Sequence, residues 1–314
     1  MYTKILIPLD GSKTAEQVLP YARFFISQFK KPVELIAIID IADMVTHVSA
    51  KSAPYLDTMI ENGVRGSEAY LNEISATFHG ANIQCAVEKG RAAEIIIERG
   101  EAETGMLIAM ATYGRSGVDR WLLGSVAEKV LRGTVNPLLL IRATERFKPE
   151  GEAILKSIIV PLDGSELAES VLPMVAGIAK KLNLAITLFR SYSVPYSLYS
   201  YGHGFYAFDI QQFMTDLRDE ARHYLENKAA EITELGVDKV SCVTIEGFGA
   251  GEIIKIGRET PNSFIAMCSH GRSGVKRWAL GSVTESVVRH SDKPVLVLRP
   301  ASMPPGTKRE EELI

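Results

Sequence analysis

The sequence has few of the residue patterns that mark secreted, metal-stapled or membrane proteins. Only 3 of its 314 residues are cysteine, and they are too scattered for a disulfide framework or a four-ligand zinc site. No apolar run approaches the length of a membrane span, and the start, MYTKILIPLD, lacks the long apolar region of a signal peptide. We therefore expect a cytoplasmic protein.

An excess of positive charge is also missing. Lys plus Arg number 35 against 38 Asp plus Glu, a formal net charge of -3, so the sequence predicts binding neither to nucleic acid nor to an anionic membrane. Hydrophobic residues make up 46% and charged residues 23%, an ordinary balance for a folded protein. A chain of this length is typically divided into about two domains.

An internal repeat organises the chain. Ile5 to Pro20 (ILIPLDGSKTAEQVLP) matches Ile158 to Pro173 (IIVPLDGSELAESVLP) at an offset of 153. Met110 to Arg142 matches Met267 to Arg299 at an offset of 157, with 18 of 33 positions identical. A period near 155 is too long for a solenoid and indicates a duplicated domain.

Each copy alternates short apolar runs with amphipathic segments, which predicts a parallel sheet covered by helices on both faces. We expect two tandem, doubly wound, five-stranded α/β domains. In the first copy the predicted strands end at about Pro8, Ile39, Glu88, Ala111 and Arg142, and the predicted helices are 12–29 (with Ser12 as N-cap), 55–78, 92–101 and 125–132.

The division of the chain follows from the repeat. We expect domains at 1–145 and 152–300, a linker at about 145–156 that contains Pro149 and Gly151, and a mobile tail at 301–314. The last strands of the copies, Pro137 to Arg142 and Pro294 to Arg299, are predicted sheet edges, which are prone to pair.

Two segments of each copy are expected to meet beyond the carboxyl ends of the strands, where open α/β sheets bind ligands. The first is the turn Asp10-Gly11-Ser12, repeated as Asp163-Gly164-Ser165. Its carboxylate is suited to accept hydrogen bonds from ribose hydroxyls or an adenine amino group. The alternative is that Asp and Ser only cap the following helix, and position alone favours neither.

The second segment is glycine-rich. Gly114-Arg115-Ser116-Gly117 begins a stretch that ends at Gly124-Ser125 before a helix, and the second copy repeats this pattern. Glycines let backbone amides approach a polyphosphate, and a helix N-terminus favours negative charge. The alternative is a capping box, because Ser125 precedes Glu128 and Ser282 precedes Glu285 by three residues. We favour phosphate binding, because a cap needs one serine and no glycine-flanked loop.

These motifs resemble those of the ATP-binding universal stress proteins, here in tandem. That family has an Asp after its first strand and a G-x2-G-x9-G-[S/T] signature after its fourth; the copies supply Ala111-x2-Gly114-x9-Gly124-Ser125 and Cys268-x2-Gly271-x9-Gly281-Ser282. The resemblance covers about nine-tenths of the chain and implies a Rossmann-like fold similar to that of adenine nucleotide alpha hydrolases. It also implies that the last strands pair in an intramolecular pseudo-dimer; a homodimer of the whole chain is left open.

By this resemblance the copies are expected to bind an adenine nucleotide, ATP, and whether both sites are occupied is left open. Mg²⁺, if present, is expected on the phosphates, because the sequence offers no carboxylate cluster to hold it. The residues expected to bind it are Pro8, Asp10, Ile38, Ala111, Gly114, Arg115, Gly117, Gly124, Ser125 and Val126 in the first copy, and Pro161, Asp163, Ser191, Cys268, Gly271, Arg272, Gly274, Gly281, Ser282 and Val283 in the second.

Both copies depart from the family pattern. Ala111 and Cys268 stand where the signature has its first glycine, and Ser191 stands where an apolar residue such as Ile38 is expected. Since side chains there crowd the ribose or remove an apolar contact, we expect the first site to bind ATP more tightly than the second.

Other features have simpler interpretations. Cys85 and Cys242 lie within predicted strands and are expected to be small core residues. Trp121 and Trp278 stand among apolar neighbours in the glycine-rich segments and are expected to pack against apolar side chains. The aromatic segment Tyr192 to Phe208 occurs only in the second copy; packing over the interdomain groove is favoured over a lid or a partner-binding surface.

The resulting hypothesis is an ATP-binding stress-response regulator with no predicted catalytic residues and no metal site. One alternative is slow ATP hydrolysis or nucleotidyl transfer on the same fold. Another is a nucleotide-free dimerisation scaffold in which the loops serve only as caps. His270 is Tyr113 in the first copy, which argues against a general base that both copies require.

Overall fold

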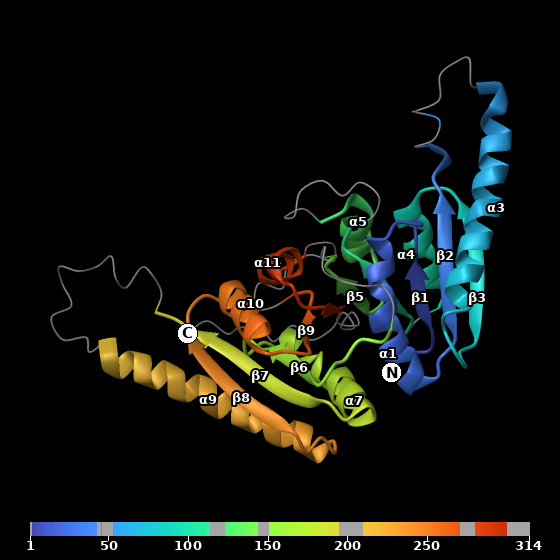
Figure 1. Ribbon diagram of the computed structural model, residues 1–314. Helices are drawn as coiled ribbons and strands as arrows, with labels where there is room; N and C mark the ends of the chain where they lie inside the picture. Colours follow the sequence, from blue (N-terminus) through green and yellow to red (C-terminus); the bar gives the residue numbers. More distant parts are fainter. Residues whose placement is uncertain are drawn as a thin grey trace, which may run out of the picture.

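The computed structural model describes residues 2–42, 45, 53–103, 105–113, 123–143, 151–194, 210–270 and 280–299 (Figure 1). The elements of the first repeat, with η marking a 3₁₀ helix, are β1 (Ile5–Pro8), η1 (Ala15–Val18), α1 (Leu19–Phe29), β2 (Val33–Ile39), η2 (Ala53–Tyr55), α3 (Leu56–Ser75), β3 (Ile83–Lys89), α4 (Ala92–Ala102), β4 (Leu107–Ala111), α5 (Ser125–Gly133) and β5 (Leu138–Ile141).

The second repeat has the same order of strands and long helices, with the short helix α6 in place of η1 and no described counterpart of η2. Its elements are β6 (Ser157–Pro161), α6 (Glu166–Glu169), α7 (Leu172–Leu182), β7 (Ala185–Tyr192), α9 (Ile210–Glu234), β8 (Val240–Glu246), α10 (Gly249–Glu259), β9 (Ser263–Cys268), α11 (Ser282–His290) and β10 (Val295–Leu298). The predicted α/β class and strand order are confirmed in both repeats.

The strands form one continuous sheet of ten strands among the described residues, in the order β3-β2-β1-β4-β5-β10-β9-β6-β7-β8. Pairing is parallel within each repeat and antiparallel between β5 and β10, where Leu139 lies opposite its own repeat equivalent, Leu296. The pairing expected for the last strands is therefore present, and it joins the two five-stranded halves edge to edge.

Apolar side chains alternate between the two faces of the sheet, as the period of a strand requires. Ile5 and Ile7 pack into one core cluster with residues of α1, α3, α7 and α9. Leu6, between them, packs into the other cluster with residues of α4, α5, α10 and α11. Helices thus cover both faces. The helices α3 and α9 lie beside the edge strands β3 and β8, at opposite ends of the molecule (Figure 1).

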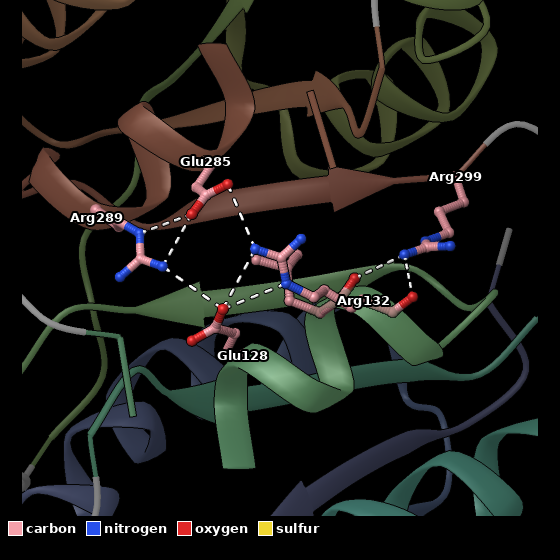
Figure 2. Close-up of polar contacts among 6 residues, drawn as sticks. Glu128, Arg132, Glu285, Arg289 and Arg299 are labelled. Atoms are coloured by element: carbon pink, nitrogen blue, oxygen red, sulfur yellow. Dashed lines mark hydrogen bonds and ion pairs between the residues drawn. The ribbon is translucent and has the colours of Figure 1, made fainter. Parts of the chain in front are cut away.

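The two repeats also meet through α5 and α11. Both helices pack on the same face of the sheet, and their side chains pair with each other across the β5–β10 junction (Figure 2). Arg132 on α5 lies 3.4 Å from Glu285 on α11, and Arg289 on α11 lies 3.6 Å from Glu128 on α5. Each arginine also pairs with the glutamate one turn earlier on its own helix. Arg299 donates to the last carbonyls of α5, including that of Leu131 at 2.9 Å.

Two local predictions are corrected. The helix predicted from Ser12 to Phe29 is divided into η1 and α1, because Pro20 has no N–H to donate to the carbonyl four residues earlier. Cys85 was expected in the core but is exposed, because β3 is an edge strand; Cys242 is partly buried against the core.

Candidate functional site

A cavity of about 240 Å³ lies at the switch point of the first repeat. The chain runs from β1 to β2 on one side and later returns on the other side as β4, so the loops that follow β1 and β4 leave in opposite directions. This volume is slightly below the roughly 300–1,000 Å³ typical of small-molecule sites. Seven of the predicted residues line it together: Pro8, Asp10, Ile38, Ala111, Gly124, Ser125 and Val126.

Asp10 closes one side of this cavity from the turn after β1. Its Oδ1 accepts a hydrogen bond from the Ser12 amide at 3.0 Å and one from the Ser12 hydroxyl at 2.6 Å. Gly11 has a φ of 79°, which a side chain would strain. The Ser12 hydroxyl in turn accepts from the Ala15 amide at 3.1 Å. Helix-start bonding and cavity lining therefore coexist: the Ser12 hydroxyl holds the amide of Ala15, the first residue of η1, and Asp10 lies at the cavity wall.

The N-terminus of α5 closes the other side. Gly124 is the N-cap, Ser125 is the first helical residue, and no side chain caps the helix there. The capping box considered as the alternative to phosphate binding is therefore not formed. The same holds at Gly281 and Ser282 of α11. Ser125 and Ser282 are exposed. First-turn amides of a helix attract anions, and these serine hydroxyls lie beside them.

The second repeat has an equivalent cavity of about 280 Å³. Asp163 Oδ1 accepts from Ser165 at the same two distances, 3.0 Å and 2.6 Å. The predicted residues that line this cavity are Pro161, Asp163, Ser191, Cys268, Gly281, Ser282 and Val283. Two independent copies of one arrangement thus bring the same predicted positions together.

Sequence reasoning missed one wall of each cavity. Ala92 and Ile96, from the first turns of α4, face the first cavity, and their equivalents Gly249 and Ile253, from α10, face the second. These residues carry no reactive group. The one sequence signal for this wall is the small residue at the start of each helix, Ala92 in α4 and Gly249 in α10. Phe189 lines the second cavity but its equivalent, Ile36, is not a lining residue of the first.

Part of the predicted site lies outside the described residues. This is so for Gly114, Arg115, Gly117, Gly271, Arg272 and Gly274, and equally for Trp121, Trp278 and most of the aromatic segment. Their roles stay predictions.

Each repeat also has a partly buried tyrosine whose hydroxyl bonds to a glutamate. Tyr70 donates to the carboxylate of Glu16 at 3.4 Å, and Tyr224 donates to that of Glu169 at 2.8 Å. Burial, more than any neighbouring charge, raises the pKa of both phenols, which keeps them neutral. Among the residues that the structure describes, no cluster of His, Cys, Asp or Glu is suited to hold a metal ion.

None of the described helices has the length and apolar character that crossing a bilayer requires. In fold, the chain resembles a universal stress protein of Archaeoglobus fulgidus, with a TM-score of 0.69 and 21% identity over 95% of this chain and 99% of that one.

Sequence comparison gives the same family. A universal stress protein of Methanocaldococcus jannaschii is 30% identical over 148 residues, which are 46% of this chain and 85% of that protein. A second one from the same organism is 36% identical over 94 residues, 29% of this chain and 57% of that protein. The model of the universal stress protein family matches residues 1–142 and again 155–299. The chain, with both of its repeats matched, belongs to the universal stress protein family.

Proposed function

We propose that each repeat binds ATP in its switch-point cavity and that the protein acts as a nucleotide-dependent regulator of the stress response. One observation carries the proposal: in both repeats a carboxylate at the end of the first strand and a helix N-terminus with an exposed serine line the same cavity. That is the combination a nucleotide needs, with an acceptor for its sugar hydroxyls at one side and donors for its phosphates at the other.

The walls between these polar ends suit a purine nucleoside. Ile38, Ile96 and Met110 give the first cavity apolar surface, against which the flat face of a base loses contact with water. The phosphates would then lie at the first turn of α5, where the backbone amides and the Ser125 hydroxyl can donate hydrogen bonds to the phosphate oxygens. The glycine-rich segment that starts at Gly114 would complete the phosphate contacts, as the family signature implies.

A regulatory role fits this site better than rapid catalysis. Asp10 already accepts two hydrogen bonds from Ser12, which orient it as a fixed acceptor. The position of His270 is Tyr113 in the other repeat, so the cavities share no imidazole base. With no carboxylate cluster to bind it among the described residues, Mg²⁺ would be held by the phosphates. Slow ATP hydrolysis remains the alternative.

The direct test is the nucleotide content of freshly purified protein. After denaturation and filtration, chromatography of the released small molecules should give an adenine nucleotide peak. Release of no nucleotide, together with no binding of added ATP, would favour the nucleotide-free scaffold. A parallel assay of phosphate release from excess ATP should show no turnover beyond the background of a protein-free control; sustained release would favour the enzyme.

A further inference from the structure

The second cavity contains a buried polar atom for which the described residues provide no partner. His270 follows β9 and lines this cavity. Its Nδ1 makes a hydrogen bond with Ser269 Oγ at 2.9 Å, while its Nε2 is buried and has no hydrogen-bond partner among the described residues. Buried polar groups are nearly always hydrogen-bonded, so an exception on a side chain that lines a cavity points to a ligand.

The surroundings of the ring favour its neutral form. Burial lowers the pKa of the His270 imidazole, and the positive charge of Arg299 lowers it further. A neutral imidazole nitrogen has no charge to offer a phosphate group. It pairs well with a hydroxyl, to which it donates or from which it accepts according to its tautomer.

The position of His270 places it near one end of such a ligand. It lies beyond the carboxyl end of β9, and Asp163 lies beyond the carboxyl end of β6, the neighbouring strand. Both residues line the second cavity, and Asp163 is the acceptor that we assign to the sugar hydroxyls. The first cavity has Tyr113 at this position, so an imidazole contact is a property of the second repeat alone.

We propose that His270 is a ligand-contacting residue of the second cavity, whose Nε2 forms a hydrogen bond with a sugar hydroxyl of the bound nucleotide. The assignment rests on the proposed function and adds a specificity residue to it. A site that has a buried group for a hydroxyl discriminates against ligands without that hydroxyl, because the group is then left unpaired. The second cavity should therefore discriminate between ribonucleotides and deoxynucleotides through His270.

The experiment isolates the second cavity in the full chain by Ser125→Glu. This change puts a negative charge at the phosphate end of the first cavity, and an exposed acidic residue in the first turn of a helix does not disturb folding. Calorimetric titrations then compare ATP, 2′-deoxy-ATP and 3′-deoxy-ATP on this parent, on His270→Phe and on His270→Gln. The control is His290→Gln on α11, where His290 Nδ1 bonds within the helix to Ser286 O outside the cavity.

We expect His270→Phe to weaken ATP binding roughly 5- to 10-fold, the effect of one neutral hydrogen bond. It should weaken binding of one of the two deoxy analogues much less, because that analogue lacks the hydroxyl concerned. His270→Gln, whose amide nitrogen reaches a similar position, should recover part of the loss, and His290→Gln should have no effect.

Two other results overturn the assignment. If His270→Phe binds all three nucleotides as the parent does, or weakens all three equally, Nε2 makes no sugar contact while nucleotide binding itself stands. If the Ser125→Glu parent binds no nucleotide at all although the unmodified chain does, the second cavity is not a nucleotide site, and the proposed function fails there as well.

Discussion

At the scale of single residues, the fold itself requires a glycine at position 124, apart from any close approach of the proposed nucleotide phosphates. A Cβ atom at this position would lie 2.8 Å from the carbonyl oxygen of Thr112, the same oxygen to which the Gly124 amide donates. At the equivalent Gly281 the corresponding distance, to the Ser269 oxygen, is 3.1 Å. Loss of ATP binding in a Gly124 variant would therefore not distinguish a lost phosphate contact from a shifted loop.

We predict that Gly124→Ala destabilises the protein by about 1–3 kcal/mol, the usual cost of overpacking, and that Gly281→Ala costs less. Both glycines have φ angles that alanine adopts readily, -59° and -62°, so the close approach to the carbonyl decides the difference. Urea unfolding of the two variants in the absence of nucleotide measures it. Equal losses, or a larger loss for Gly281→Ala, would contradict this interpretation of the contact.

The polar residues of the candidate site could be proposed from the sequence because their chemistry is visible in it. Asp10 and Ser125 stand in motifs that occur twice, and both line one cavity. Ala92 and Ile96 could not be found in this way, because an apolar wall depends on how α4 packs against the sheet. The unpaired Nε2 of His270 was equally invisible, since it depends on which neighbours the fold brings near.

At the scale of elements, α5 and α11 link the two repeats. Their N-termini line the two cavities, and farther along, Glu128, Arg132, Glu285 and Arg289 pair across the join (Figure 2). These side chains are between 21% and 39% exposed, so solvent partly screens them. Isolated surface pairs contribute little, but here each charge has a partner on both helices.

We predict that Glu285→Gln lowers the free energy of unfolding by roughly 0.5–1 kcal/mol, because it removes partners from both arginines. Raising the NaCl concentration from about 0.1 to about 1 M should reduce this loss, since salt screens exposed charges. Glu226→Gln on α9, which removes a pair within one helix, is the matched control and should have a smaller effect. A loss that does not change with salt, or equal losses in both variants, would show that the cross-repeat pairing adds nothing.

Element order was predictable because apolar runs and turn residues alternate along the chain, whereas local breaks were less so. Pro20 stands in the first turn of α1, where proline is tolerated. The sequence alone did not show that the turn before it, Ala15–Val18, forms a separate 3₁₀ helix. The exposure of Cys85 likewise follows from the place of β3 at the sheet edge, which an apolar pattern cannot reveal.

At the scale of the whole molecule, the duplication gives two similar cavities along one continuous ten-stranded sheet. The offsets of 153 and 157 in the sequence already indicated the duplication. The antiparallel contact of β5 with β10 followed from the need to cover exposed strand edges and from the family resemblance, not from the residues of those strands alone.

The central claim, that both switch-point cavities bind ATP, is tested most directly by calorimetric titration of the nucleotide-stripped full chain. The account predicts two bound ATP molecules per chain, one in either Ser125→Glu or Ser282→Glu, and none in the double variant, with all four proteins equally stable in unfolding experiments. Because both serines are exposed first-turn residues, these substitutions add charge without disturbing the fold. A double variant that binds ATP like the unmodified chain, or an unmodified chain that binds none, would contradict the account.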